Sequence, residues 1–291
     1  MEYRHLGKTG LSVSVIGIGN EHLKKVSAEE ITRIFTSALR EGVNYFDLVW
    51  SFPNIIDGLD DALHKEHANA VLAFHLGSCI SNGKYKRSRD PSECEEHLRL
   101  LLERLNLDCA PVLTIHYVPN LRIWRELSRR GIISLAKKLK QEGLAKTLSV
   151  STHDPEVVKS AAESGTVDCV MHQVNIANHM YAARTQALRV CSKLGVGVVA
   201  MKPFAGGELL KAGKKVTIPI YKTGWKMRTI TVPQETTTTK LLNYTLDQPG
   251  VCTAVTGIAS LKELTDNLNY INASNQDKNY TTLIKNLETQ E

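Results

Sequence analysis

The chain has 291 residues, of which 42% are hydrophobic and 23% are charged, and its formal net charge is +6 at pH 7. These proportions are ordinary for a globular protein, and no apolar run reaches the roughly 18 residues that a membrane helix needs. The N-terminus, MEYRHLGKTGLSV, lacks the apolar core of a secretory signal, and the 6 cysteines are scattered without a C-x-x-C pair. We therefore expect a cytoplasmic protein with reduced cysteines, no membrane partner, and neither a zinc ribbon nor an iron–sulfur cluster.

Short apolar runs alternate along the chain with longer stretches in which apolar residues recur at helical spacing. The first helix is well marked, because Ser27 and Glu30 form a capping-box pattern at its start and Gly42 follows its end. Strands are expected over 13–19, 44–49, 70–77, 110–118, 146–152, 168–175, 197–204 and 252–258. Helices are expected after them, over 27–42, 58–65, 91–106, 132–143, 154–165, 182–195, 236–250 and 261–271.

This alternation predicts an α/β fold in which parallel strands close into a (β/α)8 TIM barrel, with residues 1–291 forming one domain. A doubly wound open sheet is the alternative. That fold favours a glycine-rich phosphate turn after its first strand, and GIGNEH supplies G-x-G without a third glycine. The longest loop is expected over 205–235.

The densest basic cluster is KYKRSR, at residues 84–89. Such a cluster can contact phosphate or nucleic acid, but no nucleic-acid-binding motif accompanies it. We interpret it as a solvated loop and expect no nucleic-acid partner.

The carboxyl ends of barrel strands are where an active site is expected. Asp47, His75 and His116 end the second, third and fourth predicted strands and should face one rim. A carboxylate beside an imidazole fixes the tautomer of the ring, and a histidine so placed can act as an acid or a base near neutral pH. Two histidines and one carboxylate can also hold iron or zinc, so a metal site is a second interpretation.

Several motifs, in the same order along nearly the whole chain, resemble those of the aldo-keto reductases. YRHLGKTGLSVSVIGIG resembles their opening, a β-hairpin that plugs the barrel floor before the first strand. EGVNYFD resembles the strand that ends in their active-site aspartate, and RLNLDCAPVLTIHYVP resembles the signature that carries their histidine. LAKTLSVST, GVVAMKPFAGGEL and TGIASLKELTDN resemble later segments of the same family, which contact the nicotinamide nucleotide.

The resemblance implies a catalytic tetrad of tyrosine, lysine, aspartate and histidine, of which this chain keeps two members. The aspartate falls on Asp47 and the histidine on His116, whereas the tyrosine position holds Phe52 and the lysine position holds His75. A phenyl ring cannot donate a proton, so we expect His75 or His116 to replace the tyrosine as the acid. Tyr117 follows His116 and should point away from the barrel axis. The family is not metal-dependent, so no metal is expected.

The resemblance also implies a nicotinamide dinucleotide, either NADP or NAD. The arginine that often binds the 2′-phosphate of NADP falls on Glu263, which weakens the case for NADP. The cofactor positions carried over are Ser151, Thr152, Gln173, Met201, Lys202, Gly257, Ser260, Lys262 and Asn267.

The primary hypothesis is an oxidoreductase that acts on a bulky carbonyl or alcohol, with Glu21, Trp50 and Phe52 at the substrate. A non-redox lyase, isomerase, dehydratase or cyclase that uses Asp47 and the two histidines is the first alternative. A catalytically silent binding protein is the second. In each case we expect a small-molecule partner and a monomer or dimer.

Overall fold

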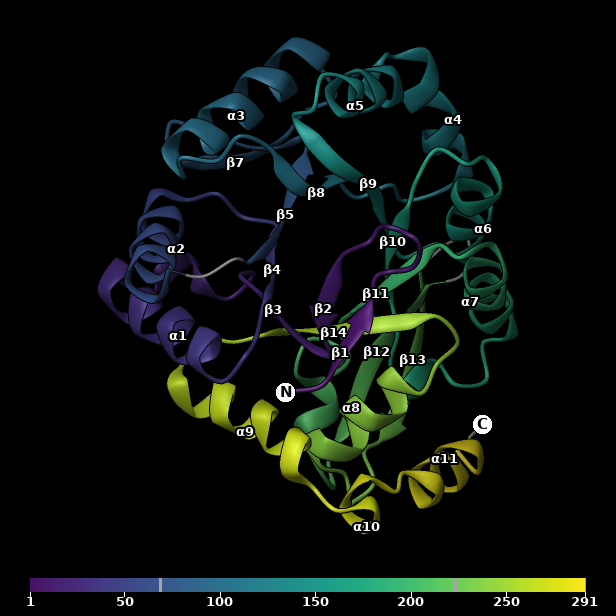
Figure 1. Ribbon diagram of the computed structural model, residues 1–291. Helices are drawn as coiled ribbons and strands as arrows, with labels where there is room; N and C mark the ends of the chain where they lie inside the picture. Colours follow the sequence, from purple (N-terminus) through teal and green to yellow (C-terminus); the bar gives the residue numbers. More distant parts are fainter. Residues whose placement is uncertain (68–69, 222–224, 291) are drawn as a thin grey trace.

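The computed structural model describes residues 1–67, 70–221 and 225–290. Parallel strands form a closed barrel in the order β10-β11-β14-β3-β4-β5-β8-β9, and helices form a ring around them (Figure 1). The barrel strands are β3 (Ile16–Gly19), β4 (Tyr45–Leu48), β5 (Val71–Leu76), β8 (Ala110–Ile115), β9 (Ala145–Thr152), β10 (Cys169–Gln173), β11 (Gly197–Met201) and β14 (Val251–Gly257). The predicted barrel is confirmed, and the open-sheet alternative is wrong, because β10 pairs with β9 on one side and β11 on the other until the ring is complete.

The helices of the described residues mostly follow the barrel strands. They are α1 (Ala28–Arg40), α2 (Pro53–Glu66), α3 (Pro91–Arg104), α4 (Leu121–Arg129), α5 (Ile132–Gln141), α6 (Pro155–Glu163), α7 (Ala182–Leu194), α8 (Thr238–Leu246), α9 (Leu261–Asn272), α10 (Asn275–Lys278) and α11 (Thr281–Glu288), with short 3-10 turns η1 (Leu23–Lys25), η2 (Ile176–Asn178) and η3 (Glu208–Leu210). In α1, the Ser27 hydroxyl accepts a hydrogen bond from the Glu30 amide, as the capping pattern predicts.

In the part of the chain that the structure describes, three antiparallel strand pairs lie outside the barrel sheet: β1 (Tyr3–His5) with β2 (Ser12–Ser14), β6 (Ser78–Ser81) with β7 (Lys84–Arg87), and β12 (Lys215–Tyr221) with β13 (Trp225–Thr231). The first is the predicted floor hairpin, and it crosses the centre of the ring in Figure 1. It corrects the predicted strand 13–19, because residues 12–14 pair with β1 and only residues 16–19 enter the barrel. The other two strand pairs, α4, α10 and α11 were not predicted, and β12 and β13 occupy much of the predicted loop 205–235.

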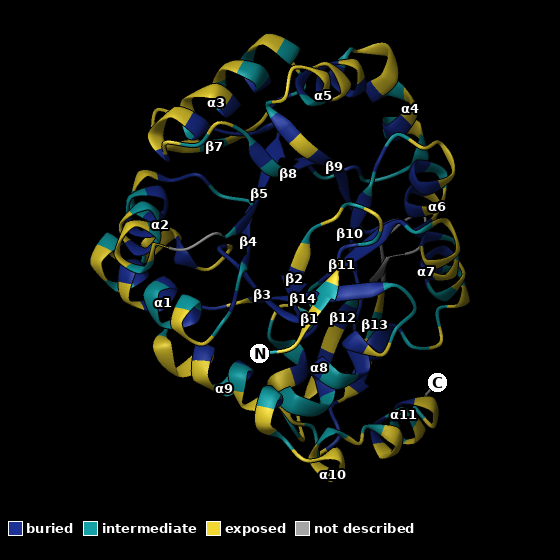
Figure 2. Cartoon of the chain, viewed as in Figure 1, coloured by how far each residue is buried: buried dark blue, intermediate teal, exposed yellow. Residues whose placement is uncertain are grey.

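The barrel interior is filled from the floor upward. Leu6 and Val13, from the floor hairpin, belong to a buried apolar cluster with inward-facing strand residues such as Tyr45, Ala73 and Met171. The barrel strands are mostly dark blue, and so buried, in Figure 2, whereas the helices expose their outer faces. Because side chains two residues apart on a strand share a face, the strand ends above this layer also point inward. No helix among the described residues is long and apolar enough to cross a membrane.

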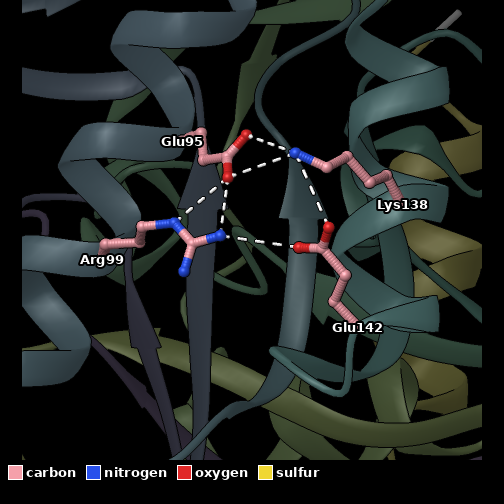
Figure 3. A network of polar contacts seen from close by, with 4 residues as sticks. All are labelled: Glu95, Arg99, Lys138 and Glu142. Carbon is pink, nitrogen blue, oxygen red and sulfur yellow. Dashed lines mark hydrogen bonds and ion pairs between the residues drawn. The ribbon is translucent and has the colours of Figure 1, made fainter.

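On the outer surface, four charged side chains join α3 to α5 (Figure 3). Arg99 donates to Glu95 at 2.7 Å and lies 3.5 Å from Glu142, while Lys138 lies 3.2 Å from Glu95 and 3.6 Å from Glu142. These groups are about one-fifth to one-half exposed, so solvent screens the attraction and each pair adds roughly 0.2–1 kcal/mol at most. The network links α3 to the end of α5 on the outer surface.

Candidate active site

Three adjacent strands bring Asp47, His75 and His116 into one row of hydrogen bonds. Asp47 is in β4, His75 in β5, and His116 follows the last residue of β8. Asp47 and His75 lie two residues after an inward-facing position, and His116 lies four residues after one. His75 Nε2 lies 2.8 Å from Asp47 Oδ1, and His75 Nδ1 lies 2.9 Å from His116 Nδ1. The sequence analysis placed these three residues at one rim, and they lie together there; their catalytic role stays a prediction.

Tyr85 extends this row, and the sequence analysis did not find it. Its hydroxyl lies 2.9 Å from His116 Nε2, on the opposite side of the ring from His75. Tyr85 belongs to β7, so residues 84–87 of the KYKRSR cluster form a strand of a hairpin rather than the predicted loop, although Lys84, Lys86 and Arg87 are exposed to solvent as expected. The signal for this hairpin is Asn82-Gly83, a pair typical of a two-residue hairpin turn, and both residues have positive φ.

Burial controls the protonation of His116. Desolvation lowers the pKa of the His116 imidazole well below its usual value, and the nearby His75, Arg87 and Arg89 lower it further. His116 is therefore neutral at physiological pH and can pass a proton from one ring nitrogen to the other, since it accepts at one and donates at the other. Both nitrogens already have a partner, His75 on one side and Tyr85 on the other.

A cavity of about 830 Å³ opens above the row. Its volume is in the range of cofactor and small-molecule sites. Beside the row itself and Tyr85, it is lined by the predicted site residues Glu21, Trp50, Ser151, Met201, Lys202, Gly257 and Asn267. Glu263 and Asp266, near the start of α9, line it as well. The cavity thus extends from the histidine row to the last barrel helix.

Phe52 is not among the side chains that line this cavity. It precedes Pro53 at the start of α2, is 5% exposed, and belongs to the apolar layer between barrel and helices. The Lys24 ammonium lies 4.6 Å from the centre of its ring. The expected contact of Phe52 with substrate therefore has no support in its position, because the turn into α2 directs the ring into the core.

Four predicted cofactor residues also lie off the cavity lining. The Thr152 hydroxyl donates to the Val118 carbonyl within the protein core. The Ser260 hydroxyl accepts from the Glu263 amide and caps α9, while the Lys262 ammonium pairs with Asp266 on the surface. Gln173 is 3% exposed at the end of β10, next to Met201 of β11, and its Oε1 has no hydrogen-bond partner among the described residues.

Tyr117 corrects a second expectation, since it lines the cavity rather than pointing away. Strand β8 ends at Ile115, and Tyr117 has φ of 32°, so the alternation of a strand no longer applies there. Its ring lies 5.2 Å from that of His153, and the Arg87 guanidinium lies 4.6 Å from the Tyr117 ring centre.

Among the described residues, no group of three or more His, Cys, Asp or Glu side chains is arranged to hold a metal ion. The chemistry of the cavity does fit a nicotinamide nucleotide. The partnerless Gln173 Oε1 is suited to accept from a carboxamide N–H, because a buried acceptor without a partner is costly. Ser151, on the adjacent strand β9, lines the cavity itself and offers a hydroxyl.

Sequence comparison finds relatives over most of the chain. An uncharacterized oxidoreductase of Bacillus subtilis, YqkF, is 24% identical over 290 residues, which is 94% of this chain and 92% of the relative. L-galactose dehydrogenase of Arabidopsis thaliana is 26% identical over 226 residues, 73% of this chain and 68% of the relative. These names favour neither the non-redox alternative nor the silent binding protein.

Comparison with solved structures supports the barrel fold described above. The holo form of aldo-keto reductase AKR11C1 from Bacillus halodurans superimposes with a TM-score of 0.75 at 22% identity, covering 99% of this chain and 96% of that chain. The model of the aldo/keto reductase family matches residues 15–288. With this match, the closed barrel and the cavity at its strand ends, the chain belongs to the aldo/keto reductase family of oxidoreductases.

Proposed function

We propose that the protein is a nicotinamide-dinucleotide-dependent oxidoreductase that interconverts the carbonyl and alcohol forms of a small molecule in the cavity above Asp47, His75 and His116. The observation that carries this proposal is the hydrogen-bonded row of Asp47, His75 and His116. This row lines a cavity that extends to helix α9. Relatives whose names are specific, L-galactose dehydrogenase and pyridoxal 4-dehydrogenase of Microbacterium luteolum, are named as dehydrogenases of small polar molecules.

The residues that would hold the nucleotide lie along the rim from β9 to α9. Ser151 of the cavity lining and Gln173, at the end of the adjacent strand β10, would hold the carboxamide, and Gly257 and Asn267 would lie along the adenosine end. When bound, the nicotinamide supplies or accepts the hydride. The chain itself orients the substrate, excludes water and moves the accompanying proton.

The charge near α9 favours NAD over NADP. Glu263 and Asp266 line the cavity there, and Glu263 Oε2 already accepts the Ala259 amide at 2.7 Å. A 2′-phosphate would face these two carboxylates, whereas a ribose 2′-hydroxyl can donate to one of them. We therefore propose NAD(H) as the preferred nucleotide.

The substrate end of the cavity favours a carbonyl compound with a flat, bulky side. Trp50 and Tyr85 pack edge to face with ring centres 4.4 Å apart, and both line the cavity. The Trp50 indole N–H donates to the Glu21 carbonyl oxygen at 3.2 Å, which fixes the ring. A rigid aromatic wall of this kind packs well against an aromatic or alicyclic substrate.

Nucleotide binding is the first test. Fluorescence titration of the purified protein with NADH and with NADPH should give saturable binding of NADH and weaker binding of NADPH. Oxidation of bound NADH is then followed with a panel of aromatic aldehydes and quinones. Gln173→Leu should weaken NADH binding, because it removes the carboxamide partner and keeps the side-chain volume. Failure of the wild-type protein to bind either nucleotide would refute the proposed function.

A further inference from the structure

Resting on the proposed function, we propose that the Tyr85 hydroxyl, presented by the hairpin β6–β7, is the group that protonates the substrate oxygen, and that Asp47, His75 and His116 resupply its proton. The phenol that position 52 lacks is thus provided by a different element of the chain. The Tyr85 oxygen is one end of the row and Asp47 is the other, and all four residues line the cavity.

The row allows two hydrogen-bonding patterns that differ by one proton. In the first, His75 Nε2–H donates to Asp47, His116 Nδ1–H donates to His75 Nδ1, and the Tyr85 hydroxyl donates to His116 Nε2. In the second, His75 carries a proton on both nitrogens and donates its Nδ1–H to His116. His116 Nε2–H then donates to the Tyr85 oxygen, and the Tyr85 hydroxyl proton is free to point at a substrate.

Reduction converts the second pattern into the first. A bound reduced nicotinamide would supply the hydride at the carbonyl carbon, and the Tyr85 hydroxyl gives its proton to the carbonyl oxygen. The Tyr85 oxygen then takes the proton of His116 Nε2, and His116 Nδ1 takes that of His75 Nδ1. The substrate gains one hydride and one proton, the nicotinamide is oxidised, and His75 returns to its neutral form beside Asp47. Alcohol oxidation is the reverse.

The hairpin that carries Tyr85 is fixed to the strands at its base and to helix α3 at its side. At its base, the Ser88 amide donates to the Gly77 carbonyl at 2.9 Å, and the Ser78 hydroxyl donates to the Val49 carbonyl. The Lys86 ammonium and the Ser88 hydroxyl both contact Glu93 of α3, at 2.8 and 2.6 Å.

Trp50 fixes the Tyr85 ring itself by edge-to-face packing. Such support matters because a proton donor is effective only when its geometry is set before the substrate arrives.

Tyr117 is the competing phenol in the cavity. Its ring packs on His153 and beneath Arg87, and none of the hydrogen bonds between described residues joins its hydroxyl to the row. A proton lost from Tyr117 would therefore not be replaced along Asp47, His75 and His116.

The central test is Tyr85→Phe, which removes one oxygen and keeps the ring against Trp50. We expect unchanged NADH affinity and a fall of about 100- to 10,000-fold in the rate of NADH oxidation with the best aldehyde or quinone of the panel. Tyr3→Phe is the matched control, because the Tyr3 hydroxyl also makes a hydrogen bond, to Gly42, but at the barrel floor; it should keep the wild-type rate. A wild-type rate in Tyr85→Phe, or an equal loss in Tyr117→Phe, would overturn the proposal while leaving the proposed function intact.

His75 and Asp47 are positioning residues in this scheme, and the pH profile tests them. The wild-type reduction rate should fall as pH rises, because the extra proton on the row is lost. His75→Gln should lower the rate and flatten that dependence, which a purely structural role would not do. A pH profile of His75→Gln that runs parallel to that of the wild type would contradict the resupply of the Tyr85 proton through the row.

A spectroscopic measurement decides the matter even if no compound of the panel is reduced. The ¹⁵N signals of the His116 ring should shift in Tyr85→Phe, and those of His75 should shift less, whereas His172, which bonds to the Thr152 carbonyl, should keep its signals. Unchanged His116 signals would refute the hydrogen bond on which the proposal rests.

Discussion

Two aromatic side chains, Phe52 and Tyr85, have different surroundings in this chain. At position 52 a phenyl ring packs in the core beside α2, and at position 85 a phenol reaches the histidine row. His75, at the position where the family resemblance implies a lysine, has a ring with two hydrogen-bonding atoms, and both are used. A lysine there has donors only, so it could not link a carboxylate to a second histidine as an imidazole does.

Glu263 gives a prediction at the same scale. Glu263→Arg should strengthen NADPH binding by roughly 10- to 100-fold, since a guanidinium would replace a carboxylate beside the 2′-phosphate. Binding of NADH should weaken or stay the same. Titration of both nucleotides measures the ratio. Glu163→Arg, the same charge change on an exposed position at the end of α6, should leave the ratio unchanged. An unaltered NADPH affinity in Glu263→Arg would place the adenosine end elsewhere.

Strand ends made part of the site predictable from the sequence. Asp47, His75 and His116 were found because parallel strands bring their carboxyl ends together, whatever the loops do. Tyr85 was missed because it belongs to a hairpin that pairs only with itself and carries the charge of a surface loop. Gln173 was expected at the cofactor, yet the lack of a partner for its Oε1 appears only once the neighbouring side chains are placed.

At the scale of elements, the barrel could be predicted from the sequence because each of its strands is a mostly apolar segment that is covered on both faces. The floor hairpin shows the limit of this pattern. Residues 13–19 have the composition of a single strand, but the change of direction at Val15 comes from pairing with β1, which is a tertiary contact. The helix α4 was missed because it is short and charged, with Trp124 and Leu127 as its buried residues.

The base of the hairpin β6–β7 gives the element-scale prediction. Gly77 has φ of 97°, and a Cβ there would lie 2.7 Å from the Ser88 carbonyl oxygen, so Gly77→Ala should push the hairpin away from the row. We expect the NADH oxidation rate to fall as in Tyr85→Phe, with a stability loss of about 1–3 kcal/mol in urea unfolding.

Gly83→Ala is the matched control for that change. It also has positive φ, 69°, but lies at the turn with nothing within 4 Å of an added Cβ. It should cost stability through backbone strain and keep most of the activity. Equal activity losses in the two variants would mean that the hairpin base does not position Tyr85.

For the whole molecule, buried histidines make the fold sensitive to acid. Burial lowers the pKa values of His116 and His153 well below the usual value and that of His172 to about 4. The unfolded chain, with ordinary histidines, binds protons more readily below about pH 6.5. The stability that these neutral rings contribute is therefore fully present above that pH and is lost as pH falls toward 4.

Urea unfolding at a series of pH values measures this loss. The free energy of unfolding should decrease steadily from about pH 6.5 downward, with His172 alone contributing on the order of 3 kcal/mol by pH 4. His172→Gln should be less stable than the wild type at pH 7, because it disturbs the bond to the Thr152 carbonyl, but its stability should fall less steeply toward acid. Parallel pH curves for the two proteins would show that His172 does not bind a proton on unfolding.

The closure of the barrel joins the two ends of the chain. Strand β14 pairs with β3, the Thr256 hydroxyl donates to the Gly17 carbonyl 239 residues away, and the Arg4 guanidinium of the floor hairpin donates to the Leu246 and Val251 carbonyls. A nascent chain on the ribosome thus cannot complete the sheet until almost all of it has been synthesised. The strands made first therefore have unpaired edges during synthesis. We expect the nascent chain to depend strongly on chaperones while only its first half has been made.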